Sequence, residues 1–322
     1  MAGKCTNPDC AAPLACHEGK KNIAECEFWI GSEKVKTEIV SKNSTLKKTK
    51  RAVLPWSGDA LGIEEIGKVS YRNSPIIFGL IGKANAGKTT YLAMLYTLFL
   101  RGGKLKDFKF CGTKTIKAWD ELYERLKVQK EKVAFPDPTP VQYLRLLHLA
   151  LRNESKRLKD LFFADASGEV FSMWSQNKDD ENAENARWVY KYANAFILFI
   201  DCKDLIKRKT LSKTELIDIA QMLNHDLKDR PVIAVWSKSD EKNNVNPKIR
   251  EKLTEELKEL FENYEELDIS NFSIDDPDIL VHENNLSVLN KLLHRTLNVD
   301  KSDLAVEEID NKPDFFLNYK TN

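Results

Sequence analysis

The sequence predicts an α/β fold built on a mostly parallel sheet, because short apolar runs alternate with longer segments of helical pattern. Residues 76–81, 195–201 and 231–237 are almost entirely apolar, which is typical of strands that are buried on both faces. Segments of helical length follow these runs. Strands that alternate with helices require right-handed crossovers, which place helices on both faces of the sheet. We therefore expect a three-layer architecture.

The composition is that of a folded protein without a global charge bias. Apolar residues make up 42% and charged residues 31% of the 322 residues, and 50 Lys and Arg balance 49 Asp and Glu. No overall attraction to nucleic acid or to an anionic membrane results. The longest mostly apolar window, 91–100, has about half the length that spans a bilayer. The N-terminus lacks the apolar stretch of a secretory signal, so we expect a cytoplasmic protein without a membrane partner.

The first half of the α/β region contains a strand, two helices and a hairpin. After the strand at 76–81, a helix is expected at 89–101, where two glycines end it. A second helix is expected at 114–132, because its apolar residues recur at spacings of three and four. Apolar runs at 141–152 and 158–166 flank a polar turn, which predicts an antiparallel hairpin and thus one antiparallel strand in the sheet.

The second half continues the alternation up to an acidic tail. A polar segment at 175–184 interrupts the pattern, and a helix at about 211–227 separates the strands at 195–201 and 231–237. Further helices are expected at 247–264 and 286–297. We divide the chain into a Cys-rich element at 1–30, a basic linker and lead-in segment at 31–74, the α/β domain at 75–298 and an acidic tail at 299–322.

A glycine-rich loop lies between the first strand and the first helix. The segment from Gly82 to Thr89 matches G-x-x-x-x-G-K-[ST], whose backbone N–H groups and helix N-terminus bind the phosphates of a nucleotide. Lys88 is expected to reach the β and γ oxygens, and the Thr89 hydroxyl to ligate Mg²⁺. The residues that we expect to contact the nucleotide in this loop are Gly82, Asn85, Ala86, Gly87, Lys88, Thr89 and Thr90.

Two further segments fit the metal and γ-phosphate end of such a site. Asp165-Ala166-Ser167-Gly168 matches D-x-x-G; we expect Asp165 to hold Mg²⁺ through water and the Gly168 N–H to sense the γ-phosphate. Asp137-Pro138-Thr139-Pro140 resembles a first switch, in which Thr139 covers Mg²⁺ and the γ-phosphate. An ordinary turn remains the alternative for this second segment, because Asp and Pro are common in turns.

A fourth segment predicts which base is bound. Ser237-Lys238-Ser239-Asp240 resembles the guanine-reading motif [NT]-K-x-D, with Ser237 in place of Asn or Thr. The Asp240 carboxylate is suited to accept hydrogen bonds from N1 and N2 of guanine, which adenine does not offer, and Lys238 is expected to lie along the base plane. A surface turn after a strand is the alternative. No S-A-x motif closes the base site, and Ser273-Ile274 is the nearest candidate for it.

The order of these motifs resembles that of TRAFAC-class GTPases over about residues 75–298. With Trp56-Ser57-Gly58, the N-A-G-K-T-T-Y-L segment and the N-terminal cysteines, the chain resembles the bacterial double-GTPase family. The resemblance implies a Ras-like P-loop fold, binding of GTP and GDP, and Mg²⁺-dependent hydrolysis of GTP. It also implies a nucleotide-driven regulator that acts with partner proteins in a multi-gene bacterial conflict or defence system.

Hydrolysis by this class of protein requires charge neutralisation and a positioned water molecule. We expect Lys88, Thr139 and Glu169 to be the catalytic residues; Glu169 takes the place where Ras-like proteins have a water-orienting Gln, and a switch-region surface carboxylate is its alternative. Asn85 occupies the position that helps to bind K⁺ in cation-dependent GTPases, which makes K⁺ a further cofactor to test. The alternative is that Asn85 only tolerates a left-handed backbone angle. No Arg stands out as an arginine finger in the chain.

The cysteines and lysines of the first 51 residues suggest a second binding element. Cys5, Cys10, Cys16 and Cys26 provide four soft ligands, which favours Zn²⁺ in a reducing compartment. Free thiols and another metal or redox role are the alternatives. The lone Cys111 and Cys202 are expected in the core. Seven basic residues between 34 and 51 form either an exposed linker or a docking strip for an acidic partner or nucleic acid.

Three functions follow from these observations. The first is a GTP-hydrolysing switch whose segments around Thr139 and Asp165 to Glu169 rearrange when the γ-phosphate leaves. The second is a scaffold or docking module, in which the cysteine element binds partners and the nucleotide is structural. The third is an ATPase, in which Asp240 does not read the base.

Overall fold

A computed structural model gives the fold of the chain. It describes residues 4–10, 26–30, 58–69, 74–126, 128–129, 132–133, 144–272 and 278–297. The chain forms two compact units, Met1–Leu54 and Pro55–Asn322. In the first unit, β1 (Lys4–Cys5) pairs antiparallel with β2 (Trp29–Ile30).

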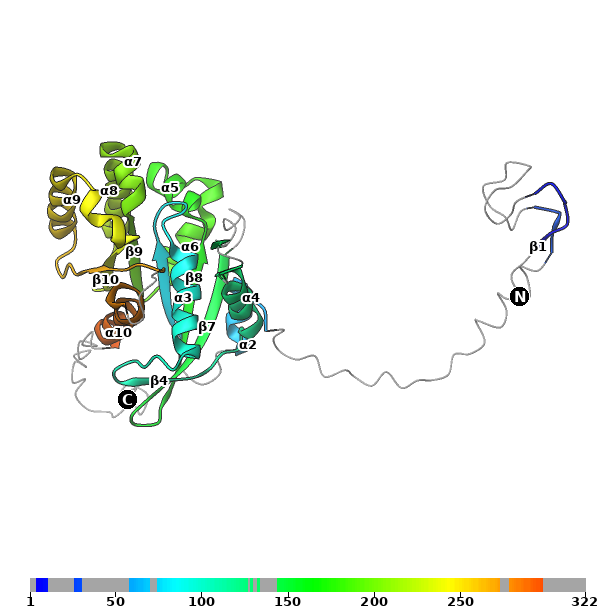
Figure 1. The fold of residues 1–322 in the computed structure, drawn as a ribbon, viewed down its shortest axis with the longest axis horizontal. Helices are drawn as coiled ribbons and strands as arrows, with labels where there is room; N and C mark the ends of the chain where they lie inside the picture. The colour runs from blue at the N-terminus through cyan, green and yellow to red at the C-terminus, as the bar shows by residue number, and fades with distance from the viewer. Residues whose placement is uncertain are drawn as a thin grey trace, which may run out of the picture. The chain divides into compact units, whose positions relative to one another are not determined.

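The second unit is built on a seven-stranded sheet (Figure 1). Its strand order is β11-β10-β9-β3-β8-β7-β4. β7 is antiparallel to both of its neighbours, β8 and β4, and every other pair is parallel. The expected α/β fold with one antiparallel strand is therefore confirmed. The strands are β3 (Ile76–Ile81), β4 (Phe108–Gly112), β7 (Leu144–Asn153), β8 (Leu158–Ala166), β9 (Ala195–Asp201), β10 (Val232–Ser237) and β11 (Glu266–Asp268).

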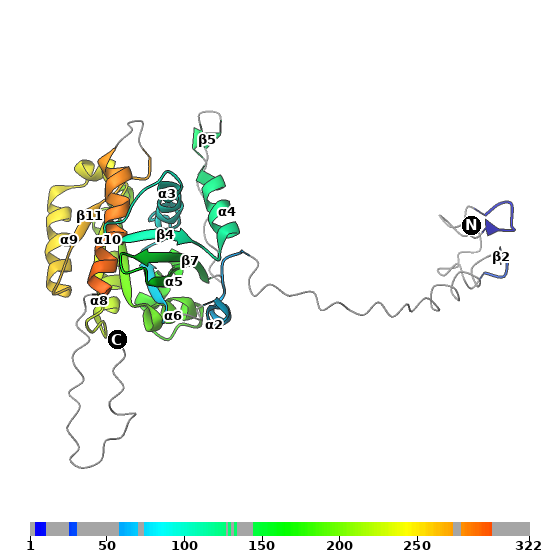
Figure 2. The same ribbon diagram turned by 90° about the horizontal axis from the view of Figure 1, so that it is seen from below.

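Helices cover both faces of this sheet (Figure 2). The core on one face includes side chains of α3, α4 and α10, and the core on the other includes side chains of α5, α6, α8 and α9. The helices are α2 (Ile66–Val69), α3 (Lys88–Leu100), α4 (Ile116–Leu126), α5 (Gly168–Gln176), α6 (Glu184–Tyr192), α7 (Cys202–Arg208), α8 (Thr210–Asn224), α9 (Pro247–Leu260) and α10 (Asn284–Leu297). Shorter helical turns are η2 (Ile63–Glu65), η3 (Glu181–Ala183), η4 (Ser239–Asn244) and the π-helical η5 (Ile279–Glu283).

The central strand β3 shows why an apolar run forms this fold. All six of its residues are buried; Ile77 and Ile81 face one core, whereas Phe78 and Leu80 face the other. The alternation of side chains along a strand places each set on its own face. Gly79 allows a close approach, because a Cβ atom there would lie 2.7 Å from Val189 Cγ1 of α6. The first helix and the β7–β8 hairpin also form where the sequence predicts them.

Several expected boundaries are wrong. The helix expected at 114–132 ends at Leu126, and β5 (Val128–Gln129) and β6 (Lys132–Val133) follow as a small hairpin. The residues three and four positions after Leu126 are Gln129 and Lys130, so the apolar stripe of α4 does not continue, and β-branched Val128 favours extended backbone. The helices expected at 211–227 and 247–264 end at Asn224 and Leu260. The polar segment at 175–184 contains the end of α5 and the turn η3.

Residues before the sheet pack onto the α/β unit. Leu61 forms an antiparallel bridge with Leu146 of β7, and the Gly58 carbonyl accepts a hydrogen bond from the Ala118 N–H of α4. Residues 58–61 therefore lie against β7 and α4. None of the helices in the described ranges combines the length and apolar composition needed to cross a membrane.

Candidate functional site

A cavity of about 630 Å³ lies where the loops after β3, β8, β9, β10 and β11 meet. These are the carboxyl ends of parallel strands, where ligands bind in open α/β sheets. The cavity therefore joins the glycine-rich loop, the D-x-x-G loop and the Ser237–Asp240 loop. It is lined by Ala84, Asn85, Ala86, Gly87, Lys88, Thr89, Thr90, Ala166, Ser167, Gly168, Glu169, Lys203, Lys238, Asp240, Ser270, Asn271 and Phe272.

The glycine-rich loop takes the sharp path between β3 and α3 that such a site requires. Gly82 and Gly87 have φ angles of 150° and 88°, and Asn85 has a φ of 61°. Asn tolerates this left-handed region better than most residues, so the backbone alone accounts for an Asn at this position. α3 begins at Lys88 without a side-chain cap. The first turn of α3 lines the cavity, where the N-terminus of a helix favours an anionic group.

Lys88 is buried at the centre of this loop. Its Nζ donates hydrogen bonds to the carbonyls of Gly82 and Lys83, at 2.9 and 3.0 Å. Burial lowers the pKa of Lys88 to about 8, and the nearby Asp165 carboxylate opposes this shift. An anionic group in the cavity would favour the charged amine again. The lysine is therefore held in place for a phosphate by two backbone oxygens.

Asp165 lies at the end of β8 and beside the start of α3. Thr89 Oγ1 donates to the Asp165 carboxylate, at 3.1 Å from Oδ2. Asp165 is fully buried, and Arg145 Nη2 of β7 lies 2.8 Å from Oδ2. Arg145 is directly opposite Asp165 in the β7–β8 register. Sequence analysis does not find Arg145, because only the register of the hairpin places it at this carboxylate.

Gly168 lies in contact with the glycine-rich loop. A Cβ atom at Gly168 would lie 2.1 Å from the Ala84 nitrogen and from the Lys83 carbonyl carbon, so no larger residue fits without a shift of the backbone. Ser167 caps α5 by accepting a hydrogen bond from the Glu169 N–H at 3.3 Å. The Glu169 side chain is exposed at the rim of the cavity.

The Ser237–Asp240 loop lies against the glycine-rich loop. Lys238 Nζ donates to the Asn85 carbonyl at 2.9 Å and pairs with Asp201 Oδ2 at 2.6 Å. Ser237 is fully buried, and its hydroxyl donates to the Ile200 carbonyl at 3.2 Å. Ser237 therefore faces the protein interior, whereas Asp240 is exposed at the cavity.

The loop after β11 closes the same end of the cavity. Ser270 Oγ donates to Asp240 Oδ1 at 3.0 Å, and Asn285 Nδ2 of α10 donates to the Ser270 carbonyl at 2.9 Å. Asn271 and Phe272 follow Ser270 along the cavity wall. The sequence does not reveal this loop, because β11 has only three half-buried residues. The sequence signal for this loop is Ser270 after a short strand, followed by Asn271 where an S-A-x motif has Ala.

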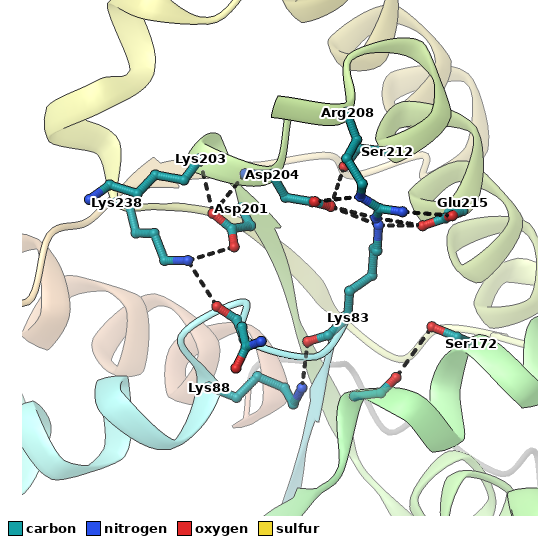
Figure 3. Close-up of polar contacts among 12 residues, drawn as sticks. Lys83, Lys88, Ser172, Asp201, Lys203, Asp204, Arg208, Ser212, Glu215 and Lys238 are labelled. Carbon is teal, nitrogen blue, oxygen red and sulfur yellow. Dashed lines mark hydrogen bonds and ion pairs between the residues drawn. The ribbon is translucent and has the colours of Figure 1, made fainter. Parts of the chain in front are cut away.

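A charged cluster ties the glycine-rich loop to α7 and α8 (Figure 3). Lys83 pairs with Asp204 at 2.7 Å and also with Glu215. Arg208 donates to both carboxylates, and Ser212 Oγ lies 2.6 Å from Asp204 Oδ2. This cluster is a second feature that the sequence motifs do not reveal. It fixes the first turn of the glycine-rich loop from outside the cavity.

Asp201 links the two halves of the site. Its carboxylate accepts hydrogen bonds from the N–H groups of Lys203 and Asp204, at 2.9 and 3.3 Å, and so caps α7. Its second oxygen pairs with Lys238 (Figure 3). The corner between β9 and α7 therefore positions both the base-motif lysine and the charged cluster.

The cysteines give a mixed result. A backbone hydrogen bond at Asn7 lowers the pKa of the Cys5 thiol, but burial and the neighbouring Cys10 and Cys26 raise it above its usual value. In the part of the chain that the structure describes, no group of three His, Cys, Asp or Glu side chains is arranged to hold a metal. Cys202 is buried, as expected. Cys111 is exposed on the edge strand β4, so its expected place in the core is wrong.

Some predicted residues lie outside the described residues. They include the whole first-switch candidate with Thr139, the candidate closing residues Ser273 and Ile274, and Cys16. The basic segment at 34–51 and the tail at 299–322 also lie outside them.

The fold and the site define the class of protein. A mostly parallel α/β sheet carries a G-x-x-x-x-G-K-[ST] loop between β3 and α3, and a D-x-x-G loop and a base-motif loop face it across one cavity. This is the arrangement of a P-loop protein of the GTPase class.

The family follows from comparison with known sequences. The model of a family described as Double-GTPase 2 matches residues 76–294, and the chain belongs to this family. The predicted resemblance to double-GTPases is therefore confirmed. No curated protein matches the chain.

Several solved structures are similar to the chain at low identity. A mutation variant of SsGBP is 14% identical with a TM-score of 0.38, covering 70% of this chain and 56% of that one. A GTP-binding protein from Sulfolobus solfataricus, in complex with GDP, is 14% identical with a TM-score of 0.36, covering 69% and 52%. A putative nucleolar GTP-binding protein 1 from Plasmodium falciparum is 12% identical with a TM-score of 0.41, covering 71% and 90%. The chain spans just over half the length of the first two.

Proposed function

We propose that this chain binds GTP and GDP with Mg²⁺, hydrolyses GTP slowly, and acts as a nucleotide-dependent switch for partner proteins. The observation that carries this proposal is the base end of the cavity. There Ser270 holds one oxygen of Asp240 at 3.0 Å, and Asp240 and Lys238 line the same cavity as Lys88. Phosphate and base recognition thus belong to one site.

Asp240 accounts for a preference for guanine. A carboxylate accepts hydrogen bonds only, and guanine offers donors at N1 and N2, whereas adenine offers none there. With adenine bound, the exposed Asp240 carboxylate would keep the Ser270 hydroxyl as a partner but would gain no hydrogen bond from the base. A hydrogen bond to a charged group contributes about 1.5–3 kcal/mol, which corresponds to roughly 10- to 150-fold in affinity.

The residues at the other end fit a hard cation. Thr89 and Asp165 provide a hydroxyl and a carboxylate, which are the oxygen ligands that Mg²⁺ prefers. Bound there, Mg²⁺ would neutralise charge on the β- and γ-phosphates. Arg145 orients the buried Asp165 carboxylate through its 2.8 Å contact. Lys88 exchanges its two backbone carbonyls for phosphate oxygens when the nucleotide binds.

The switch follows from the contact between Gly168 and the glycine-rich loop. Gly168 is the first residue of α5, so a change in its position on loss of the γ-phosphate is passed directly to that helix. We propose that Gly168 senses the γ-phosphate, that Thr139 completes the metal site, and that Glu169 orients water. The partners that read α5 are proposed to belong to a multi-protein bacterial defence system, on the strength of the family resemblance.

The N-terminal unit is proposed to bind Zn²⁺ through Cys5, Cys10, Cys16 and Cys26. The proposal rests on the four soft ligands that the sequence provides within its first 26 residues. The proposal also includes the division of the chain into the Cys-rich element at 1–30, the linker and lead-in segment at 31–74, the α/β domain at 75–298 and the tail at 299–322. Removal of a structural metal would unfold such a small unit.

Binding and turnover of GTP and ATP by the purified chain test the function. We expect Mg²⁺-dependent GTP hydrolysis that Lys88→Ala abolishes, and measurements in K⁺ and Na⁺ buffers decide whether Asn85 helps to bind K⁺. Tight GTP binding with no turnover, alone or with partners, would favour a scaffold with a structural nucleotide. Equal or tighter ATP binding would favour an ATPase.

A further inference from the structure

Lys83 is a residue of the glycine-rich loop to which the motif gives no role. The motif G-x-x-x-x-G-K-[ST] leaves the position after its first glycine open, and this chain has a lysine there. The Lys83 side chain is only 12% exposed and lines a second cavity, of about 390 Å³, between the loop, α5 and α7. It is not among the described residues that line the nucleotide cavity. Any effect of this side chain on a nucleotide is therefore indirect.

The Lys83 ammonium completes a balanced network of two cations and two carboxylates (Figure 3). Lys83 pairs with Asp204 of α7 at 2.7 Å and with Glu215 of α8. Arg208 pairs with the same two carboxylates, at 2.6 and 2.7 Å. Single ion pairs near a surface contribute little, whereas several charges in a network contribute more. Lys83 is the member that comes from the glycine-rich loop, so the network ties this loop to two helices.

The start of α7 holds the same loop at a second point. Asp201 caps α7 and pairs with Lys238, whose Nζ donates to the Asn85 carbonyl at 2.9 Å. The loop is thus tied to α7 through the Lys83 side chain and, two residues later, through the Asn85 carbonyl. The backbone between these two ties is fixed from both ends.

This fixed backbone is the part of the loop that meets the D-x-x-G loop. A Cβ atom at Gly168 would lie 2.1 Å from the Lys83 carbonyl carbon and from the Ala84 nitrogen, so Gly168 lies against the peptide bond that joins these two residues. The Lys83 carbonyl also accepts the hydrogen bond from Lys88 Nζ, at 3.0 Å. A shift of this one peptide bond would therefore disturb the contact with Gly168 and the hydrogen bond of Lys88.

We propose that Lys83 is a positioning residue for GTP hydrolysis, which acts by fixing the Lys83–Ala84 peptide bond against Gly168. This inference rests on the proposed GTP-hydrolysing function. Gly168 is proposed to contact the γ-phosphate, which GDP lacks. Release of the loop from α7 therefore lowers hydrolysis and leaves the affinity for GDP nearly unchanged. Glu215 acts in the same way from α8, because it holds the Lys83 ammonium.

The ion pair between Lys213 and Glu256 provides a matched control. Lys213 lies in α8 and is 14% exposed, and its Nζ pairs with Glu256 of α9. It has the charge and nearly the burial of Lys83, but it joins two helices instead of holding the glycine-rich loop. Its loss measures what such an ion pair contributes to the stability of the fold.

The first test compares single-turnover hydrolysis of GTP, affinity for GDP and melting temperature in variants of the full chain. Lys83→Met should lower the hydrolysis rate by about tenfold, since a displacement of 1 Å at a reacting group costs roughly 10²-fold and a partial release of the loop costs less. Its affinity for GDP should stay within about threefold of wild type. Lys83→Arg keeps a cation near both carboxylates and should recover most of the rate. Lys213→Met should lower the melting temperature as Lys83→Met does, with the hydrolysis rate of wild type.

A double variant tests whether Glu215 acts through Lys83. Glu215→Gln alone should lower the hydrolysis rate by about threefold, because Asp204 still holds the ammonium. In the Lys83→Met background it should cause no further loss, because both changes act through one contact. Losses that multiply would show that Glu215 acts by another route and would contradict the proposed network.

Hydrogen exchange of the nucleotide-free chain tests the positioning without any nucleotide. The backbone N–H groups of residues 82–88 should exchange faster in Lys83→Met than in wild type, and at the wild-type rate in Lys213→Met. Unchanged exchange in Lys83→Met would overturn the inference, because it would show that the network does not hold the loop.

Two results of the hydrolysis assay would also overturn it. A wild-type rate in Lys83→Met would show that the side chain does not set the position of the peptide bond. Equal losses of rate in Lys83→Met and Lys213→Met would assign the effect to the stability of the fold. If wild type does not hydrolyse GTP, the proposed function fails, and hydrogen exchange still decides whether Lys83 holds the loop.

Discussion

Replacement of Gly168 by Ala should separate hydrolysis from GDP binding. The new Cβ atom would lie 2.1 Å from the Ala84 nitrogen and 2.3 Å from the Lys83 carbonyl oxygen, whereas real Cβ contacts are almost never below 3.0 Å. The D-x-x-G loop must therefore retreat from the glycine-rich loop by about 1 Å, and a displacement of this size at a reacting group costs roughly 10²-fold in rate. The Gly168 φ angle is not positive, so the cost is steric and not conformational.

We expect GTP hydrolysis by Gly168→Ala to fall by about 10²-fold in single-turnover phosphate release. Affinity for GDP should stay within about threefold, because GDP has no γ-phosphate for the Gly168 N–H to contact. Overpacking costs about 1–3 kcal/mol, so the melting temperature should drop by roughly 2–10 °C.

The matched control is Gly67→Ala in α2, where a Cβ atom meets nothing within 4 Å. It should leave hydrolysis and GDP affinity unchanged. Normal turnover in Gly168→Ala would refute the reasoning, since it would show that the loop does not need its contact with Lys83 and Ala84. An equal loss in Gly67→Ala would show that the effect is not specific to this contact.

Three further predictions concern the charged groups of the site and the cysteines. Burial lowers the pKa of Lys88 to about 8, so above that pH the unfolded chain binds more protons than the nucleotide-free fold. The free energy of unfolding should therefore rise from pH 8 towards 10 in calorimetry. Lys88→Met should remove this rise, and a rise that persists in the variant would assign it to another group. Arg145→Gln should change the Mg²⁺ concentration at which GDP binding is half-maximal, because Arg145 contacts Asp165; an unchanged Mg²⁺ dependence would show that the contact is only structural. Elemental analysis of the purified chain should find one Zn²⁺ per chain, lost in Cys5→Ser/Cys10→Ser, and a metal-free wild type would contradict the zinc site.

The elements that sequence analysis finds are those with a strong local pattern. β3 is apolar throughout because it is buried on both faces at the centre of the sheet, and the β7–β8 hairpin has a clear polar turn. β4 and β11 are edge strands with mixed or partial burial, so neither forms an apolar run. α5 follows the D-x-x-G motif without a break, and its polar end merges into the next turn.

The site shows the same limit. Lys88, Thr89, Asp165 and Asp240 belong to three motifs of adjacent residues, and the structure brings the three loops together at one cavity or its edge. The residues that hold these loops come from distant elements: Arg145 from β7, Asp201 from the end of β9, and Ser270 from the loop after β11. Register and chain crossings place these residues, and no local spacing records them. The departure of Ser237 from its motif is visible in the sequence, whereas the contact between Ser270 and Asp240 is not.

The most direct test of the central claim is the relative affinity of the purified chain for GTP and ATP, with Mg²⁺, for wild type and Asp240→Asn. The site at Asp240 and Ser270 predicts that wild type prefers GTP by at least about tenfold, because guanine offers the carboxylate donors at N1 and N2 and adenine offers none there. The preference should fall in Asp240→Asn while the melting temperature stays close to that of wild type. Equal or tighter binding of ATP by wild type would contradict the account and leave the glycine-rich loop as an ATP site.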